Sequence, residues 1–329
     1  MSGIVTLTMN PALDITTSTT MVTPTDKLRC GPPRYDPGGG GINVARVIRV
    51  LGGSPIALFP AGGPSGRLLE TLVAAEGVSV RRIEIDGSTR ESFTVNEGRT
   101  GQQYRFVLPG PELTAAEQEN CLSIFAEVAR GAEYVVASGS LPPGVSPDFY
   151  QRVAGIVRGL GARLILDTSG EALRQMRSDV YLLKPSIREL RNCVGRELLS
   201  ADDQLAAARE LISAGVSEVV VLSLGEQGAL AVTAQGHERL HSIDVPAGSG
   251  VGAGDSMLAA ITVGLSRGWV LGDAVRLGIA AGAAMLLTPG TQPCLRRDVE
   301  RLYAGLAGGR AHRTRRLHDE EGQLGAPTR

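Results

Sequence analysis

Residues 250–256 read Gly-Val-Gly-Ala-Gly-Asp-Ser, and an apolar run, Met257–Ile261, follows at once. Small residues at this spacing allow successive backbone N–H groups to converge on one point. The apolar run predicts a helix, whose N-terminus adds partial positive charge at that point. The stretch therefore predicts an anion site, suited to a phosphoryl group in transfer, with Asp255 as the base for an attacking hydroxyl. A tight strand-to-helix turn with Asp255 as its N-cap is the simpler alternative.

Other nucleotide-binding patterns fit this chain poorly. The sixth position of the Rossmann Gly-x-Gly-x-x-Gly pattern is Asp255, and the stretch lies near the C-terminus rather than after the first strand. A P-loop and the protein-kinase Asp-Phe-Gly set are both absent from the sequence. A nucleoside triphosphate would therefore have to bind by another route.

Composition limits the class of protein. The 329 residues suffice for one large α/β domain or two small ones, and 43% of them are hydrophobic. A net charge of −1 argues against nucleic acid as the main partner. No apolar stretch has the length of a membrane span, and no signal-peptide pattern precedes the first predicted strand. We therefore expect a cytoplasmic protein that does not bind membranes, with its four scattered cysteines reduced.

Short apolar runs alternate with helical patterns along most of the chain. The predicted strands are residues 4–9, 56–59, 134–137, 164–167, 181–184 and 219–223, and the predicted helices are residues 43–51, 66–76, 115–129, 147–160, 187–194 and 202–214. This alternation predicts a mostly parallel sheet with helices on both faces, and catalytic groups at the carboxyl ends of its strands.

Two segments break the alternation. Ile15–Tyr35 and Ser88–Val107 have strand patterns without an intervening helix, which predicts antiparallel strands in a small lid outside the main sheet. Residues 309–329 are rich in Gly, Arg and Glu without periodicity, which predicts a disordered tail. We expect one domain over residues 1–308, with the lid formed by about 15–35 and 88–107.

Seven motifs occur in an order that is more specific than any one of them. In chain order they are Thr6–Asp14, Pro37–Ala45, Ser138–Gly144, Leu183–Pro185, Ser223–Ala229, Val251–Ser256 and Ala280–Gly282. Together they resemble the ribokinase-like sugar kinases of the PfkB family, over residues 3 to 306. Within that family, Lys27–Cys30 and the four glycines Gly38–Gly41 are similar to the 6-phosphofructokinase branch.

The resemblance implies a ribokinase-like three-layer α/β sandwich with a central, mostly parallel sheet and a small antiparallel β lid. It implies ATP-dependent phosphorylation of fructose 6-phosphate, with Asp255 as the base and the N–H groups of Gly252, Ala253 and Gly254 as the anion hole. Tagatose 6-phosphate and fructose 1-phosphate remain alternative substrates; in their kinases a lysine usually stands at the position of Gly40. An oxidoreductase and a non-catalytic sugar-phosphate sensor are further alternatives, weakened by the failed Rossmann spacing and by the retained Asp255.

The same resemblance implies the binding residues. For the sugar phosphate they are Asp14, Lys27, Gly38, Gly39, Asn43, Arg90, Arg105 and Ser138. Solvated surface charge is the ordinary alternative for Lys27, Arg90 and Arg105, which lie in or beside the lid. For ATP they are Lys184, Ser186, Ser223, Gly225, Gly228 and Ala283.

For metals, Glu189 corresponds to the acidic residue of the Asn-x-x-Glu motif, which organises Mg²⁺ through water. Ser186 stands where that motif has its Asn, a departure that shortens the reach of the side chain. A loop for a monovalent cation such as K⁺ corresponds to Ser249, Val251, Met285, Thr288, Gly290 and Gln292. The exposed lid would favour a homodimer.

Overall fold

A nine-stranded sheet forms the centre of the molecule in the computed structural model, which describes residues 3–246, 250–288 and 292–306. The strand order is β13-β12-β11-β10-β9-β8-β1-β4-β5. In chain order these strands are β1 (Gly3–Leu7), β4 (Pro55–Ala61), β5 (Ser79–Glu84), β8 (Ala132–Ser138), β9 (Arg163–Asp167), β10 (Val180–Leu183), β11 (Ser217–Ser223), β12 (Ala229–Thr233) and β13 (Gly236–Leu240). All pairs are parallel except β11–β12 and β12–β13, and the six predicted strands are confirmed.

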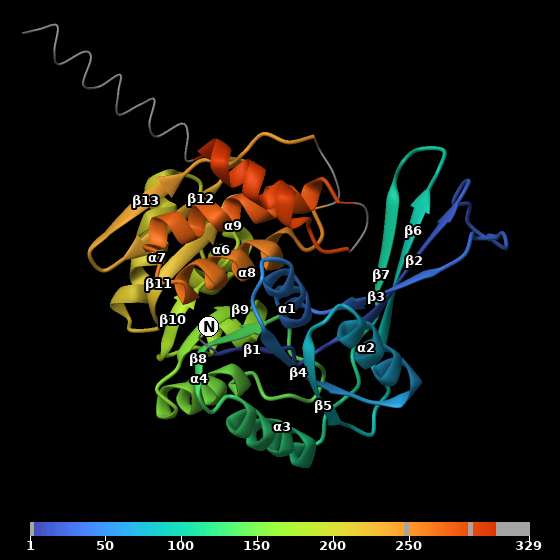
Figure 1. Ribbon diagram of the computed structural model, residues 1–329, viewed down its shortest axis with the longest axis horizontal. Coiled ribbons are helices and arrows are strands. Elements are labelled where there is room, and N and C mark those ends of the chain that lie inside the picture. The colour runs from blue at the N-terminus through green and yellow to red at the C-terminus, as the bar shows by residue number, and fades with distance from the viewer. Residues whose placement is uncertain (1–2, 247–249, 289–291, 307–329) are drawn as a thin grey trace, which may run out of the picture.

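Helices cover both faces of this sheet (Figure 1). One face carries α1 (Gly40–Val50), α2 (Gly63–Ala75), α8 (Ala253–Ser266) and α9 (Leu271–Leu286). The other carries α3 (Ala115–Val128), α4 (Phe149–Gly159), α5 (Gly170–Arg174), α6 (Ile187–Val194) and α7 (Ala201–Ser213). Residues 296–306 are also helical, and a short 3₁₀ turn, η1 (Gly225–Gln227), joins β11 to β12.

The core follows the period-two alternation of the strands. Val219 and Val221 of β11 pack in the cluster that contains α8 and α9, whereas Val220 and Leu222 pack with α6 and α7. Strands buried on both faces read as continuous apolar runs, which is why the sequence pattern identified them. The three-layer α/β sandwich is confirmed.

The lid is a second, four-stranded sheet that extends away from the three layers (Figure 1). Its order is β3-β2-β6-β7, with β2 (Ala12–Thr19), β3 (Arg34–Gly38), β6 (Arg90–Glu97) and β7 (Gln103–Val107). The pairs β2–β3 and β6–β7 are antiparallel, as predicted, but the central pair β2–β6 is parallel. Strand β2 follows β1 and strand β6 follows β5. Because β1 and β5 run in the same direction in the main sheet, β2 and β6 enter the lid in the same direction.

Helix α1 begins three residues before the predicted start at Asn43. Gly39 is its N-cap with φ +116°, and a Cβ on Gly41 would lie 2.5 Å from the Leu7 carbonyl oxygen. Glycine is therefore needed where the start of α1 meets the end of β1. The predicted tail, Ser249 and Gly290 lie outside the described residues. In the described part of the chain, the helices are too short or too polar to cross a lipid bilayer.

Candidate active site

Asp255 lies in the first turn of α8. Gly252, with φ +79°, is the N-cap of this helix, and Asp255 is its third residue. The carboxylate is therefore not the helix cap, so the simpler explanation for the glycine-rich stretch does not hold. The Asp255 side chain is therefore available for contacts with other elements.

Two other elements contribute partners to the Asp255 carboxylate. Asn43 Nδ2 in α1 donates to Asp255 Oδ2 at 2.9 Å, and Ser138 Oγ at the end of β8 donates to Oδ1 at 3.4 Å. Burial among protein atoms, together with the charge of Asp167, raises the pKa of Asp255 to about 6. The bond from Asn43 acts in the opposite direction. A carboxylate with such a pKa is a better proton acceptor than a free aspartate and is still ionised at neutral pH.

A buried ion pair lies beside this base. Lys184 Nζ is 2.9 Å from Asp167 Oδ2, and their side chains are only 4% and 15% exposed. A Cβ on Gly254 would lie 3.5 Å from Lys184 Nζ, so the ammonium group reaches the start of α8. Burial lowers the pKa of Lys184, but the attraction of Asp167 outweighs it, and the net shift is upward. The lysine therefore brings a fixed positive charge to the predicted anion hole.

The backbone of that hole is partly engaged within the chain. Ala253 N–H donates to the Gly250 carbonyl oxygen at 3.3 Å. At this length the bond is weak, so the Ala253 N–H group is only partly engaged. Gly252 and Gly254 flank it, and a Cβ on Gly252 would meet the Met285 side chain at 3.5 Å.

The sugar side of the site begins at Asp14 in β2. A Cβ on Gly38 would lie 2.4 Å from Asp14 Oδ2, so the missing side chain makes room for this carboxylate. Burial raises the pKa of Asp14 to about 6, while Arg90 and Arg105 lower it. The structure thus places two of the three predicted cations around Asp14. The third, Lys27, is exposed in the connection between β2 and β3.

Arg90 is fixed by backbone oxygens. It donates to the Asn10 carbonyl through Nη2 at 3.1 Å and to the Leu108 carbonyl through Nη1 at 3.3 Å. Asn10 follows β1 and Leu108 follows β7, so Arg90 joins the lid to the main sheet. Arg105 lies in β7, paired with Thr94 of β6.

Gly40 lies directly against Ser138. A Cβ at this position would be 2.3 Å from Ser138 Oγ and 2.9 Å from its carbonyl carbon. A lysine therefore has no room at position 40 unless Ser138 moves. Since Ser138 also donates to Asp255, the four-glycine run is coupled to the Asp255 carboxylate.

Five of the six predicted nucleotide residues lie at or just after the ends of β10 and β11, and Ala283 does not. Ser223 N–H donates to the Pro185 carbonyl oxygen at 2.9 Å, and Ser186 and Ser223 form a parallel bridge. Gly225 and Gly228 have φ +58° and +91°, and a Cβ on Gly228 would lie 2.0 Å from the Leu240 carbonyl oxygen. Ala283 is buried in α9.

Ser186 and Glu189 form a capping box at the start of α6. Ser186 Oγ accepts from Glu189 N–H at 3.3 Å, and Glu189 Oε2 accepts from Ser186 N–H at 2.7 Å. The serine therefore replaces the expected asparagine as a helix cap and holds Glu189 by its backbone. Glu189 is also among the charges that act on Lys184 and Asp167, so it lies near this ion pair.

Potential metal ligands are sparse. No group of three His, Cys, Asp or Glu side chains that could hold a metal ion occurs among the described residues. In the predicted K⁺ loop, Val251, Met285, Thr288 and Gln292 are described, and Thr288 Oγ1 donates to the Ala284 carbonyl oxygen at 3.3 Å.

The family model of the pfkB family carbohydrate kinases matches residues 7–298. The chain belongs to this family. ATP-dependent 6-phosphofructokinase isozyme 2 of Mycobacterium tuberculosis (strain ATCC 25618 / H37Rv) is 65% identical over 300 residues, covering 91% of this chain and 88% of that protein. ATP-dependent 6-phosphofructokinase isozyme 2 of Escherichia coli K12 is 43% identical over 309 residues, covering 93% of this chain and 100% of that protein.

Solved structures agree with this PfkB assignment. Phosphofructokinase-2 from Escherichia coli in complex with fructose-6-phosphate has a TM-score of 0.86 at 41% identity, covering 93% of this chain and 100% of that one. The same protein in complex with potassium has a TM-score of 0.90 at 43% identity and the same coverage. Its tetrameric inhibited form has a TM-score of 0.88 at 42% identity, again with that coverage.

Sequence reasoning missed two groups in the PfkB site. Asp167 was predicted only as the end of a strand, although its place at a carboxyl end was a signal for a role in the cleft. Arg46 was not singled out at all, and nothing in its local pattern distinguishes it from a surface arginine on a helix.

Proposed function

We propose that this PfkB kinase transfers the γ-phosphoryl group of ATP to fructose 6-phosphate and forms fructose 1,6-bisphosphate and ADP. The observation that supports this most directly is the Asp255 carboxylate, held by Asn43 and Ser138 at the N-terminus of α8 beside Lys184. The related 6-phosphofructokinases at 65% and 43% identity support the substrate.

The reaction uses this arrangement as follows. Asp255 takes the proton as the sugar hydroxyl oxygen forms its bond to the γ-phosphorus, and the bond to the β,γ-bridging oxygen breaks to release ADP. The start of α8 and the Lys184 ammonium stabilise the charge on the transferred group. Asp14 binds sugar hydroxyls, and Arg90 and Arg105 on the same side of the lid bind the phosphate that the sugar already carries.

The lid faces support these roles. Residues directly opposite one another in paired strands project from the same face. Asp14 of β2 lies opposite Ser92 of β6. Thr94, two residues after Ser92 on the same face of β6, lies opposite Arg105 of β7. Arg90 lies opposite Ala12, two residues from Asp14, and so shares the face. This polar face carries the residues for a sugar phosphate.

Magnesium fits the nucleotide side through water. Mg²⁺ retains several waters and needs only one or two carboxylates, which matches Glu189 near Asp167 without a three-ligand cluster among the described residues. Mg²⁺ bound with ATP supplies neutralising charge to the phosphates. A monovalent cation such as K⁺ at the loop around Val251 and Thr288 is a further proposal, supported by the potassium complex of the Escherichia coli relative.

A substrate panel tests the proposal. The purified protein is incubated with ATP and Mg²⁺ and, in turn, fructose 6-phosphate, tagatose 6-phosphate, fructose 1-phosphate and fructose. We expect the highest kcat/KM with fructose 6-phosphate and little turnover of unphosphorylated fructose. A higher kcat/KM for either other sugar phosphate would refute the substrate and retain the kinase. ATP-independent reduction of a nicotinamide cofactor would refute the kinase itself.

The opposite face of the lid supports assembly of the protein through this sheet. One row of directly paired residues, Tyr35–Ile15–Phe93–Phe106, crosses all four strands. Tyr35, Phe93 and Phe106 are 43%, 37% and 54% exposed. Exposed aromatic rows mark association surfaces, so we propose a homodimer through the lids. Phe106→Asp should convert the dimer to a monomer in analytical ultracentrifugation; an unchanged mass would exclude this face.

A further inference from the structure

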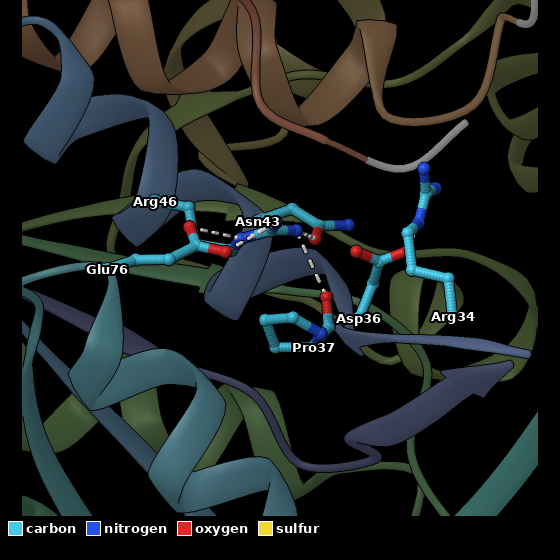
Figure 2. Close-up of polar contacts among 6 residues, drawn as sticks. All are labelled: Arg34, Asp36, Pro37, Asn43, Arg46 and Glu76. Atoms are coloured by element: carbon cyan, nitrogen blue, oxygen red, sulfur yellow. Dashed lines mark hydrogen bonds and ion pairs between the residues drawn. The ribbon is translucent and has the colours of Figure 1, made fainter. Parts of the chain in front are cut away.

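Arg46 is a fully buried arginine next to the active site. It lies in α1, one turn after Asn43, and is 3% exposed. A buried guanidinium is costly unless it is paired and its donors are used. Among the described residues, Arg46 points toward acceptors on Glu76, Pro37 and Asn43, which come from different segments of the chain (Figure 2).

The first acceptor is the Glu76 carboxylate, just after α2. Arg46 Nε donates to Glu76 Oε2 at 2.8 Å and Nη2 donates to Oε1 at 2.7 Å. This bidentate pair fixes the plane of the guanidinium. Glu76 keeps 31% of its side chain exposed, so most of the desolvation falls on the arginine. The pair leaves Nη1 aimed at the other two acceptors.

Nη1 reaches both the lid and Asn43. It donates to the Pro37 carbonyl oxygen of β3 at 3.1 Å and to Asn43 Oδ1 at 3.4 Å (Figure 2). Pro37 precedes Gly38, against which the Asp14 carboxylate packs. One nitrogen atom therefore contacts Asn43, which binds the catalytic base, and Pro37, which lies where β3 leads into α1. We call this end of β3 the root of the lid.

The contacts of Asn43 with Arg46 and with Asp255 require the same orientation of its carboxamide. An asparagine can present either its oxygen or its NH₂ group to a neighbour. A guanidinium only donates, so it selects the orientation with Oδ1 toward Arg46 and Nδ2 toward Asp255. Nδ2 then donates to Asp255 Oδ2 at 2.9 Å. The reversed amide would place an NH₂ group against a guanidinium and an oxygen against a carboxylate.

We propose that Arg46 is a positioning residue for phosphoryl transfer, which orients the Asn43 carboxamide toward Asp255 and holds the root of the lid through the Pro37 carbonyl. The proposal rests on the proposed kinase function of Asp255. Arg46 and Asn43 line one cavity of about 20 Å³ together with Gly252 and Met285, so the guanidinium lies close to the start of α8. It acts through Asn43 and does not touch the reacting atoms.

Arg46→Lys tests the inference while keeping the charge. A lysine ammonium lacks the planar fork and cannot hold Glu76 while it also donates to Pro37 and Asn43. We expect kcat to fall by about 10- to 100-fold, because a misplaced group near the base has effects of that size. KM for ATP should stay within about twofold, since binding of the nucleotide does not use Asn43. Unchanged kcat would refute the proposal.

Two matched variants separate positioning from stability. Glu76→Gln removes the negative charge but keeps one acceptor oxygen that can hold the guanidinium in its plane, so it should lower Tm without lowering kcat by more than about twofold. Arg49→Lys makes the same substitution on the exposed side of α1 and should change neither quantity. If kcat falls in proportion to Tm in both Glu76→Gln and Arg46→Lys, the role of Arg46 is structural only.

A double-mutant cycle tests the route through Asn43. In an Asn43→Ala background, Arg46→Lys should lower kcat by less than about threefold, because the residue through which it acts is already gone. Independent, multiplicative effects would contradict this route.

A titration that needs no turnover keeps the test apart from the substrate assignment. Asn43 lowers the pKa of Asp255 as a hydrogen-bond donor, so loss of its orientation should raise that pKa. A ¹³C NMR titration of the Asp255 carboxyl, assigned by its absence in Asp255→Asn, should show this rise in Arg46→Lys, with Asp167 and Lys184 left in place. An unchanged pKa would refute the positioning role even if the preferred sugar were another phosphosugar.

Discussion

Asp14 and Gly38 are packed so closely that a Cβ on Gly38 would lie 2.4 Å from Asp14 Oδ2. The two residues belong to neighbouring strands of the lid, β2 and β3, which pair with Ala12 opposite Gly38. The glycine is therefore a requirement of the adjacent carboxylate rather than of a turn. A side chain at position 38 must displace the group that we assign to the sugar hydroxyls.

Gly38→Ala should weaken sugar binding without affecting ATP. The displaced Asp14 should lower kcat/KM for fructose 6-phosphate by about 10- to 100-fold, as expected when a positioning contact moves by about an ångström. Gly98→Ala is the matched control, because a Cβ there would lie 3.7 Å from the Thr19 carbonyl oxygen, an ordinary contact. Steady-state kinetics with each substrate varied in turn provide the measurement. Equal effects of the two substitutions would show that the lid responds to any added methyl group.

Asp255→Asn should remove most of the turnover. Loss of a general base typically costs about 10²- to 10⁴-fold in rate. The amide can still meet Asn43 and Ser138, so the fold and the KM for ATP should be retained. Circular dichroism and initial rates check both points. If the variant keeps more than about a tenth of the wild-type kcat, Asp255 is not the base.

The pH dependence of kcat should show an acid limb near the pKa of Asp255. Because burial raises this pKa to about 6, the base becomes protonated and inactive as the pH falls through that value. At saturating fructose 6-phosphate, Asp14 is engaged by the sugar, so the limb in kcat reports Asp255. A kcat that stays constant down to about pH 4, the range of an ordinary aspartate, would contradict the assignment.

The raised pKa of Asp255 makes stability change with pH in the opposite direction to kcat: kcat falls as the pH is lowered, whereas stability falls as the pH is raised. Between the ordinary pKa of 3.8 and about 6, the folded protein binds more protons at Asp255 than the unfolded chain does. Its contribution to stability is therefore complete below the ordinary value and is lost as the pH rises through about 6. Asp255→Asn removes this pH-dependent contribution. Urea unfolding should thus show the variant gaining stability relative to wild type between pH 5 and pH 8, and a constant difference would exclude the linkage.

Arg90→Ala should raise KM for the sugar phosphate selectively. A charge-assisted bond to a phosphate contributes roughly 1.5–3 kcal/mol, so KM for fructose 6-phosphate should increase about 10-fold or more. KM for ATP should change little, and poor turnover of unphosphorylated fructose should not worsen. Arg81→Ala, an exposed arginine on β5, is the matched control. A similar loss with unphosphorylated fructose would mean that Arg90 serves only to hold the lid.

Sequence alone predicted the parts of this kinase that depend on near neighbours in the chain. Short continuous apolar runs, separated by helical patterns, identified the six inner strands, because each of these strands is buried on both faces. The small residues before Met257 predicted the N-terminus of α8 and the place of Asp255. The order of motifs identified the family, since several short patterns in sequence are far more specific than one.

Only the tertiary structure decided how distant residues meet. Asn43 and Asp255 are 212 positions apart, and the contact between them depends on which helices cover the same face of the sheet. The pairing of Lys184 with Asp167 arises because β10 and β9 are neighbours, and the parallel β2–β6 pair arises from where two strands leave the main sheet. The burial of Arg46 likewise requires α1, α2 and the root of the lid together. Local periodicity carries no information about such contacts, since they are set by strand order and helix packing.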